Sequence, residues 1–295
     1  MTHPVTQQEL SRQINASANR FANFLLRNGF ETPKVAICTG TNGSENIIAM
    51  LQKSKQISFS VLGFTEPTVE GHSGMVHVGY LSGALVCVVQ GRLHYFEGVT
   101  MHAIVLPVRT LCVCGVNNFI FTNASGSMGE EYEVGDIAFI YDHVNNLGDS
   151  PLRGFPTVLK KNDGDEFKLD RFVSMQNCYD REWIKKSQEQ IGRLFANTVV
   201  YTAVPGPELE TDAEIERKYS PQADVIGMSM IPEVIAVRQF GAKVLGLTLI
   251  TNLIGKAAKK ITHQNNLSMV SDADERFSRV IDGCVRALTF VPAIA

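Results

Sequence analysis

Residues 84–122 read ALVCVVQGRLHYFEGVTMHAIVLPVRTLCVCGVNNFIFT, and this stretch decides the fold class. It begins with an apolar run at 84–90, rich in valine and of the length of a buried strand. A polar segment follows, then a longer apolar stretch at 101–111 that we expect to be helical, and then another apolar run at 119–122. Strand, helix and strand in this order are typical of an α/β fold with a mostly buried sheet.

The same alternation continues through the rest of the chain. Further strands are predicted at 35–38, 137–141, 198–203 and 244–250, and further helices at 6–30, 45–53, 181–195, 232–240 and 272–288. Between Asn145 and Cys178 lies a long irregular segment, and such segments usually carry function or pack on a partner. Because neither a repeat nor a linker divides the chain, we expect one domain over residues 1–295.

Composition excludes several classes of protein. Hydrophobic residues make up 44% of the 295, enough for a large core, and the net charge of −3 is spread along the chain, which argues against nucleic-acid binding. The N-terminus lacks an apolar signal core and no run approaches membrane-spanning length, so we expect a cytoplasmic protein without a membrane partner. Six cysteines without a CxxC pair predict reduced core residues.

Polar, glycine-containing segments occur where predicted strands end, which is where ligands bind in α/β sheets. They are residues 39–44, 71–74, 90–98 and 122–127. Taken singly, the first two also fit ordinary turns. In the third, Arg92 and His94 point the same way if the backbone is extended, and such a pair suits a phosphate dianion. A surface salt-bridge cluster with Glu97 is an equally good interpretation of that segment alone.

Polar residues also occur later in the chain, at strand ends or helix starts. Glu210 lies between a predicted strand and a helix, and Pro232 suits the first turn of the helix that follows residues 227–231. The predicted strand at 244–250 ends at Thr251 and Asn252. By itself Asn252 is more typical of a helix cap or a turn.

Together these segments resemble the trimeric purine nucleoside phosphorylases, in which similar motifs occur in the same order. The resemblance covers about residues 20–290. It rests on GHSG (71–74), GRLHYFEG (91–98), TNASG (122–126), GPELETDAE (206–214), VIGMSMIPEV (225–234) and LITN (249–252), with VGDI (134–137), Asp142-His143 and PLRG (151–154) in support.

The resemblance implies a single α/β domain with a mixed, distorted central sheet flanked by helices, assembled as a homotrimer. It implies cleavage of inosine, guanosine or their deoxy forms by inorganic phosphate, with no metal or organic cofactor. The implied phosphate site is Thr41, His72, Arg92, His94, Ser229 and the backbone of Ala124. The implied ribose site is Phe96, Met228 and His263, and the base site is Ala124, Ser125, Gly126, Leu209, Glu210, Ile226 and Asn252. Phe167 resembles the residue that closes the neighbouring subunit's site.

The chemistry of a 6-oxopurine explains these residue types, with His94, Glu210 and Asn252 as the catalytic set. A carboxylate at Glu210 accepts from N1–H, and the Asn252 amide donates to N7 or O6. Negative charge flows into the base as the glycosidic bond breaks. A donor at N7 or O6 therefore binds the transition state more strongly than the substrate.

Several positions depart from the family pattern. The phosphate loop contains Thr41, Asn42 and Ser44 where the family has a glycine-rich Gly-Ser-Gly-Leu-Gly, which puts phosphate affinity in question. Phe96 stands where the family has a tyrosine that contacts the ribose hydroxyls, so we expect a weaker grip on ribose. Leu209 replaces a phenylalanine beside the base. The contact with the 5′-hydroxyl falls either to His263 or to a residue near Asp272.

Three other functions compete with this interpretation. A methylthioadenosine phosphorylase shares the fold but usually carries an aspartate for a 6-amino group, whereas this chain has Asn252 and Glu210. A nucleoside-binding homologue with little turnover would explain the altered loop. Hydrolysis in place of phosphorolysis is the third alternative.

Overall fold

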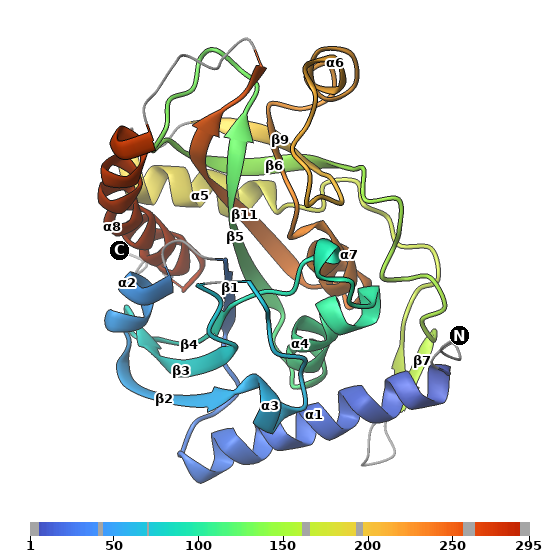
Figure 1. Cartoon of the computed structure of the whole chain (residues 1–295). Coiled ribbons are helices and arrows are strands. Elements are labelled where there is room, and N and C mark those ends of the chain that lie inside the picture. The colour runs from blue at the N-terminus through green and yellow to red at the C-terminus, as the bar shows by residue number, and fades with distance from the viewer. Residues whose placement is uncertain are drawn as a thin grey trace.

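The computed structural model describes residues 6–40, 44–69, 71–160, 166–192, 197–255 and 263–289. Its centre is a nine-stranded mixed sheet with the order β10-β9-β6-β11-β5-β1-β4-β3-β2 (Figure 1). The strands are β1 (Val35–Thr39), β2 (Gln52–Ser58), β3 (Met75–Leu81), β4 (Ala84–Gln90), β5 (Asn118–Ser127), β6 (Ile137–Asn145), β9 (Thr198–Ala203), β10 (Val225–Gly227) and β11 (Lys243–Leu253). A separate small hairpin pairs β7 (Val158–Lys160) with β8 (Glu166–Lys168).

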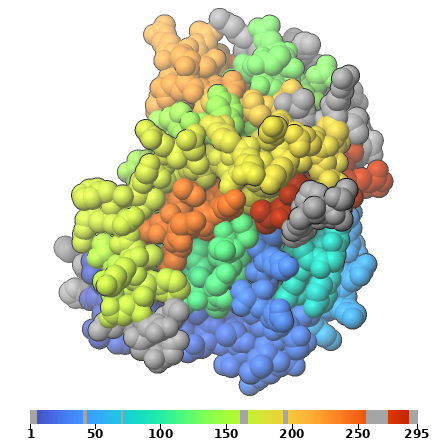
Figure 2. Space-filling model, turned by 180° about the vertical axis from the view of Figure 1, so that it is seen from behind, coloured from blue at the N-terminus to red at the C-terminus, as the bar shows by residue number. Residues whose placement is uncertain are grey.

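Helices flank this sheet in two groups. In the first group α1 packs on α4 and α4 packs on α7, and in the second group α5 packs on α8 (Figure 1). Seen from behind in Figure 2, α1 (blue) forms the base of the molecule and α5 (yellow) lies above it. The helices are α1 (Gln7–Arg27), α2 (Ser44–Ala49), α3 (Phe59–Leu62), α4 (Met101–Val113), α5 (Arg181–Ile191), α6 (Asp212–Glu214), α7 (Ile231–Gln239) and α8 (His263–Thr289), with a 3-10 turn η1 (Tyr95–Glu97) and a π-helical turn at Ile215–Tyr219.

Local sequence explains where the long helices begin. The Thr6 hydroxyl accepts the Glu9 N–H at the start of α1, and the Thr100 hydroxyl accepts the Ala103 N–H at the start of α4. Along α1 the buried residues recur at helical spacing, so one face of the helix packs against the core. None of the described helices is long and apolar enough to span a membrane.

The sheet closes on itself at one end. β10 pairs in parallel with β9 and also antiparallel with the end of β5, where Val225 faces Ser127 and Ile226 faces Gly126. Since β5, β11, β6, β9 and β10 are joined in turn, these strands form a closed ring. The small residues at the end of β5 therefore lie inside a strongly bent part of the sheet, next to β10.

The α/β fold with a mixed sheet confirms the predicted class, and all six predicted strands lie side by side in the sheet, as β9, β6, β11, β5, β1 and β4. The fully buried β1 pairs in parallel with β4 and β5, which explains its continuous apolar sequence. All six cysteines are free, and five of them are buried core residues as predicted, whereas Cys114 is half-buried.

Several predicted boundaries were wrong. Residues 122–127 and 251–252 are not loops, because β5 and β11 continue through them as paired strands. The helix predicted at 45–53 ends at Ala49, and β2 begins at Gln52. The polar, exposed edge strand β2 lacks the apolar alternation that marks a half-buried strand. The last helix begins at His263 and not at 272.

Candidate active site

A cavity of about 490 Å³ opens where β5, β11 and β10 meet the segments after β4 and β9. Its wall includes side chains from segments that lie far apart in the sequence. They are Gly40, His72, Arg92, His94, Phe96, Asn123, Ala124, Ser125, Gly126, Leu209, Glu210, Asp212, Ile215, Ile226, Gly227, Met228, Ser229, Thr251, Asn252, Leu253, Ile254 and Gly255.

Arg92 is fixed by the protein on three sides. Its Nε donates to the carboxylate of Glu233 on α7, its Nη1 donates to the Thr122 carbonyl at 2.9 Å, and its Nη2 donates to the Cys38 carbonyl at 3.3 Å. The guanidinium therefore joins β1, β5 and α7 behind the cavity. Each terminal nitrogen carries a second hydrogen, which a bound anion can accept.

Glu97 holds the imidazole of His94 in one orientation. One oxygen of Glu97 lies 3.1 Å from His94 Nδ1 and accepts the His94 backbone N–H at 2.6 Å. Its other oxygen accepts the Thr68 backbone N–H at 2.8 Å and the Thr68 hydroxyl at 2.6 Å. Burial raises the pKa of Glu97, but these hydrogen bonds outweigh it, so the net pKa is lowered and the carboxylate is ionised at neutral pH. His94 Nδ1 must then carry the hydrogen, which leaves Nε2 for a ligand.

Burial keeps both histidines of the cavity neutral. It lowers the pKa of His94 to about 4, helped by the nearby charge of Arg92, and the same two causes lower the pKa of His72. The His72 ring is anchored by its Nδ1, 2.8 Å from the backbone nitrogen and 2.9 Å from the backbone oxygen of Arg92. The rings of His72 and His94 are 5.1 Å apart, and Phe96 stacks on His94 at 4.8 Å.

Tyr201 sets the position of Ser229 on the cavity wall. Its hydroxyl accepts the Ser229 backbone N–H at 3.2 Å and lies 3.3 Å from the Ser229 carbonyl. Gly227 lies over the same ring, because a Cβ there would come within 2.7 Å of the Tyr201 hydroxyl. The backbone of Ala124 is also close, and an added Cβ on Gly227 would approach its carbonyl at 3.3 Å. A larger residue at position 227 would push these elements apart.

A β-bulge presents Asn252 to the other end of the cavity. The pairing of β11 with β5 shifts register between Ile250 and Asn252, so Thr251 is the extra residue. The Thr251 hydroxyl lies 3.2 Å from Asn252 Oδ1. Because Oδ1 accepts from Thr251, the amide nitrogen remains as a donor. Gly126 makes room for it, since a Cβ at that position would lie 2.9 Å from Asn252 Nδ2.

Acidic and apolar residues after β9 complete the end of the cavity near Asn252. Glu210 and Asp212 line the cavity, and Leu209 lines its mouth with 80% of its surface exposed. Ile215 of the π-helical turn packs against the backbone at Gly255, where an added Cβ would lie 2.8 Å away. The end of the cavity near Asn252 thus combines carboxylates, an amide donor and apolar walls.

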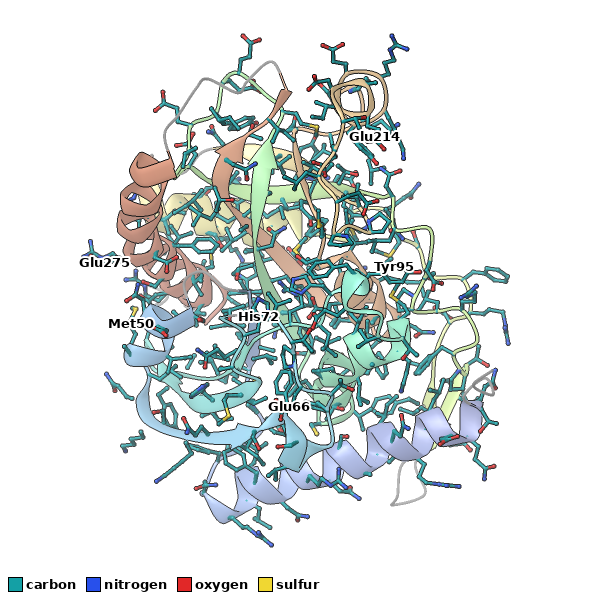
Figure 3. All side chains as sticks on the ribbon, viewed as in Figure 1. Met50, Glu66, His72, Tyr95, Glu214 and Glu275 are labelled. Atoms are coloured by element: carbon teal, nitrogen blue, oxygen red, sulfur yellow. The ribbon has the colours of Figure 1, made fainter. Side chains whose placement is uncertain are left out.

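The two chemically different ends are separated along β5. Arg92 contacts Thr122, whereas Asn252 lies against Gly126, four residues further along the strand. At about 3.3 Å per residue this separation is about 13 Å. In Figure 3, His72 lies near the middle of the molecule and Glu214 of α6 lies well above it, in line with this separation.

Known proteins share both the sequence and the fold. The family model described as the phosphorylase superfamily matches residues 34–286. Purine nucleoside phosphorylase 1 of Geobacillus stearothermophilus is 34% identical over 279 residues, which cover 92% of this chain and 98% of that protein. The chain belongs to the purine nucleoside phosphorylase family.

Solved structures of purine nucleoside phosphorylases have the same fold. The schistosoma enzyme solved in complex with hypoxanthine matches with a TM-score of 0.80 at 26% identity, covering 97% of this chain and all of that one (100%). The Schistosoma mansoni enzyme solved with adenosine matches with a TM-score of 0.79 at 26% identity, covering 95% of this chain and 98% of that one.

Most of the residues that the family resemblance predicted for the site lie in the one cavity. Three do not. Thr41 lies outside the described residues. His263 begins α8, but its side chain is outside the described part of the chain. The Phe167 ring packs edge to face on Phe240 of its own chain at 5.8 Å and does not line the cavity, so its role toward a neighbouring subunit stays a prediction.

Sequence reasoning missed the residues that orient the predicted ones. Glu97 and Glu233 were visible as acids near Arg92 and near Pro232, but no sequence signal pairs Glu233 with an arginine 141 residues away. Asp212 also lines the cavity, although its position at the start of α6 is that of an ordinary helix-terminal acid. No group of three or more metal-binding side chains occurs among the described residues.

Proposed function

We propose that the protein cleaves 6-oxopurine nucleosides, inosine and guanosine and their deoxy forms, with inorganic phosphate, and releases the base and ribose 1-phosphate or deoxyribose 1-phosphate. One observation supports this most strongly. A single cavity holds an arginine and two histidines at one end and an amide donor with a carboxylate about 13 Å along β5. That length suits a phosphate, a ribose and a purine arranged in line.

At the inner end, the second hydrogens of the Arg92 guanidinium, the Ser229 hydroxyl and the Ala124 backbone would hold phosphate. His94 Nε2 would share a proton with it, because the ring is neutral and Nδ1 already donates to Glu97. Bound in this way, phosphate attacks C1′ of the ribose as the C1′–N9 bond breaks. Phe96 and Met228 would pack on the sugar between the two ends.

At the outer end, the leaving base takes the bonding electrons. Asn252 Nδ2 would donate to N7 or O6, where the negative charge develops, and Glu210 would accept from N1–H. Thr251 supports this arrangement. Its hydroxyl donates a hydrogen bond to Asn252 Oδ1, which leaves Asn252 Nδ2 as the group that can donate to the base. The hydrogen bond from Asn252 strengthens as negative charge develops on the base, and this lowers the barrier to breaking the C1′–N9 bond.

We also infer that the protein acts in the cytoplasm as a homotrimer, with no metal or organic cofactor. The family resemblance supports the trimer, and Phe167 or a neighbour would reach the adjacent subunit. Light scattering on the purified full chain tests the assembly, and a mass near that of one chain would contradict it. Activity that survives exhaustive dialysis against a chelator would support catalysis without a metal.

The deciding experiment follows hypoxanthine release from inosine with and without phosphate. We expect release only with phosphate, with ribose 1-phosphate formed in equal amount. Asn252→Ala should lower kcat/KM on the order of 100- to 1,000-fold. Asn118→Ala, at the opposite end of β5, is the matched control and should change it little. Adenosine, which has a 6-amino group and lacks N1–H, should react far more slowly than inosine.

Two results would overturn the proposal. Release without phosphate would indicate a hydrolase. Tight inosine binding without any release would indicate a nucleoside-binding member of the family. The pairing of Arg92 with Glu233, which neutralises the charge that would bind phosphate, would then explain the lack of turnover.

A further inference from the structure

The base end of the cavity carries a second carboxylate, that of Asp212, on the same side of the chain as Glu210. Thr211 between them is extended, with φ −76° and ψ 157°. In an extended segment, residues two apart project to the same side. Both acids accordingly line the cavity, and their Cα atoms are about 7 Å apart.

The Thr211 side chain points away from the cavity, and its bonds to Glu214 hold the backbone between Glu210 and Asp212 in place. Its backbone N–H and its hydroxyl both donate to Glu214 Oε2 at 2.9 Å, and the Glu214 N–H donates back to the hydroxyl at 3.3 Å. This reciprocal capping fixes the start of α6, which Figure 3 marks by the label of Glu214. The directions of Glu210 and Asp212 are therefore set by the backbone before a ligand binds.

Neither carboxylate has a partner in the part of the chain that the structure describes. Among the described residues, no hydrogen bond or ion pair involves the side chain of Glu210 or Asp212. Two neighbouring carboxylates repel each other, and a ligand edge with several N–H donors relieves that repulsion better than an edge with one.

We infer that Asp212 is a specificity-determining residue that recognises the 2-amino group of a 2-amino-6-oxopurine nucleoside. This inference rests on the proposed function. Guanosine presents N1–H and two amino hydrogens on one edge, whereas inosine presents N1–H alone. The two oxygens of Glu210 accept hydrogen bonds from N1–H and from the nearer amino hydrogen, and Asp212 accepts a hydrogen bond from the remaining amino hydrogen.

The expected effect is on binding and not on the bond-breaking step. The amino group lies on the far side of the purine from the glycosidic bond, so its contact is equally strong in substrate and transition state. A hydrogen bond to a carboxylate is worth about 10- to 100-fold, and exposure of Asp212 to solvent favours the lower end of that range.

The test compares guanosine and inosine in the wild type, Asp212→Ala and Asp212→Glu. Affinity is measured by calorimetry in phosphate-free buffer, and kcat and KM are measured with phosphate. We expect Asp212→Ala to weaken guanosine binding about tenfold and to raise its KM equally, with inosine unchanged within about twofold. Asp212→Glu should keep most of the preference. Glu208→Gln is the control, because Glu208 is exposed and does not line the cavity.

Equal losses for guanosine and inosine in Asp212→Ala, or no loss for either, would overturn the inference. Calorimetry separates this failure from a failure of the proposed function. A protein that binds guanosine through Asp212 but releases no base supports the specificity role and contradicts phosphorolysis. A protein that cleaves both nucleosides equally well with and without Asp212 supports phosphorolysis and contradicts the role.

Discussion

Arg92 and Glu233 form a buried ion pair, with side chains only 2% and 6% exposed. Arg92 follows β4, and Glu233 belongs to the first turn of α7. Burial raises the pKa of Glu233, and the adjacent guanidinium opposes that rise only in part. The pair fixes the guanidinium against the wall of the cavity, so its orientation does not depend on a bound ligand.

Removal of Glu233 should destabilise the protein strongly. Glu233→Ala leaves the Arg92 charge buried without a counter-charge, and we expect the free energy of unfolding to fall by about 3–5 kcal/mol. Urea unfolding of the variant measures this. The control is Glu275→Ala, which removes an exposed pair with Arg279 on α8 and should cost below about 1 kcal/mol. Equal losses in the two variants would contradict the importance of burial.

Glu97→Gln should impair the use of phosphate. The amide no longer offers an ionised acceptor to His94 Nδ1, so the ring loses its fixed orientation and Nε2 no longer faces phosphate reliably. We expect kcat/KM for phosphate to fall about tenfold or more, with a smaller change in the KM for inosine. Glu66→Gln is the control, because Glu66 accepts the Ser60 N–H and does not line the cavity. An unchanged phosphate dependence in Glu97→Gln would show that His94 needs no such support.

Phe96→Tyr should strengthen the grip on ribose. Phe96 stacks on His94 and lines the cavity, but its ring has no hydroxyl to bond a sugar oxygen. A single added hydrogen bond is worth about 1 kcal/mol, so the KM for inosine should fall about fivefold. Kinetics with inosine and 2′-deoxyinosine, before and after the change, measure the effect. If the wild type already binds inosine as tightly as Phe96→Tyr, the missing hydroxyl has no consequence.

Stability should fall as the pH drops from 7 to 5. Burial lowers the pKa of His94, His102 and His143 to about 4, against about 6.5 in the unfolded chain. Between these values the unfolded state binds more protons, so the stabilisation is complete above pH 6.5 and is lost progressively toward pH 4. Each histidine should contribute about 1–2 kcal/mol of loss at pH 5.

His143→Gln tests this prediction without touching the cavity. Urea unfolding at pH 7 and pH 5 should show a smaller difference for the variant than for the wild type. The same difference in both proteins would mean that His143 titrates normally in the folded state.

Motif order in the sequence predicted much of the site. The glycine-flanked His72, the Arg92–His94 segment and Asn252 were recognised as separate polar segments, and all of them line one cavity. Their neighbours were harder to predict. The end of β5 looked like a loop because Ala, Ser and Gly are poor strand formers, yet pairing with both β11 and β10 makes it a strand.

Local patterns in the chain were enough to predict the α/β class, the strands of the parallel core and the family, because buried strands and motif order can be recognised in the sequence. The folded structure was needed to see that Glu233 pairs with Arg92, that a bulge at Thr251 presents Asn252, and that Asp212 shares a cavity with Glu210. The first of these joins residues 141 apart, and the others depend on strand register and on the direction of a few side chains. Long-range packing fixes such features, and no local pattern records them.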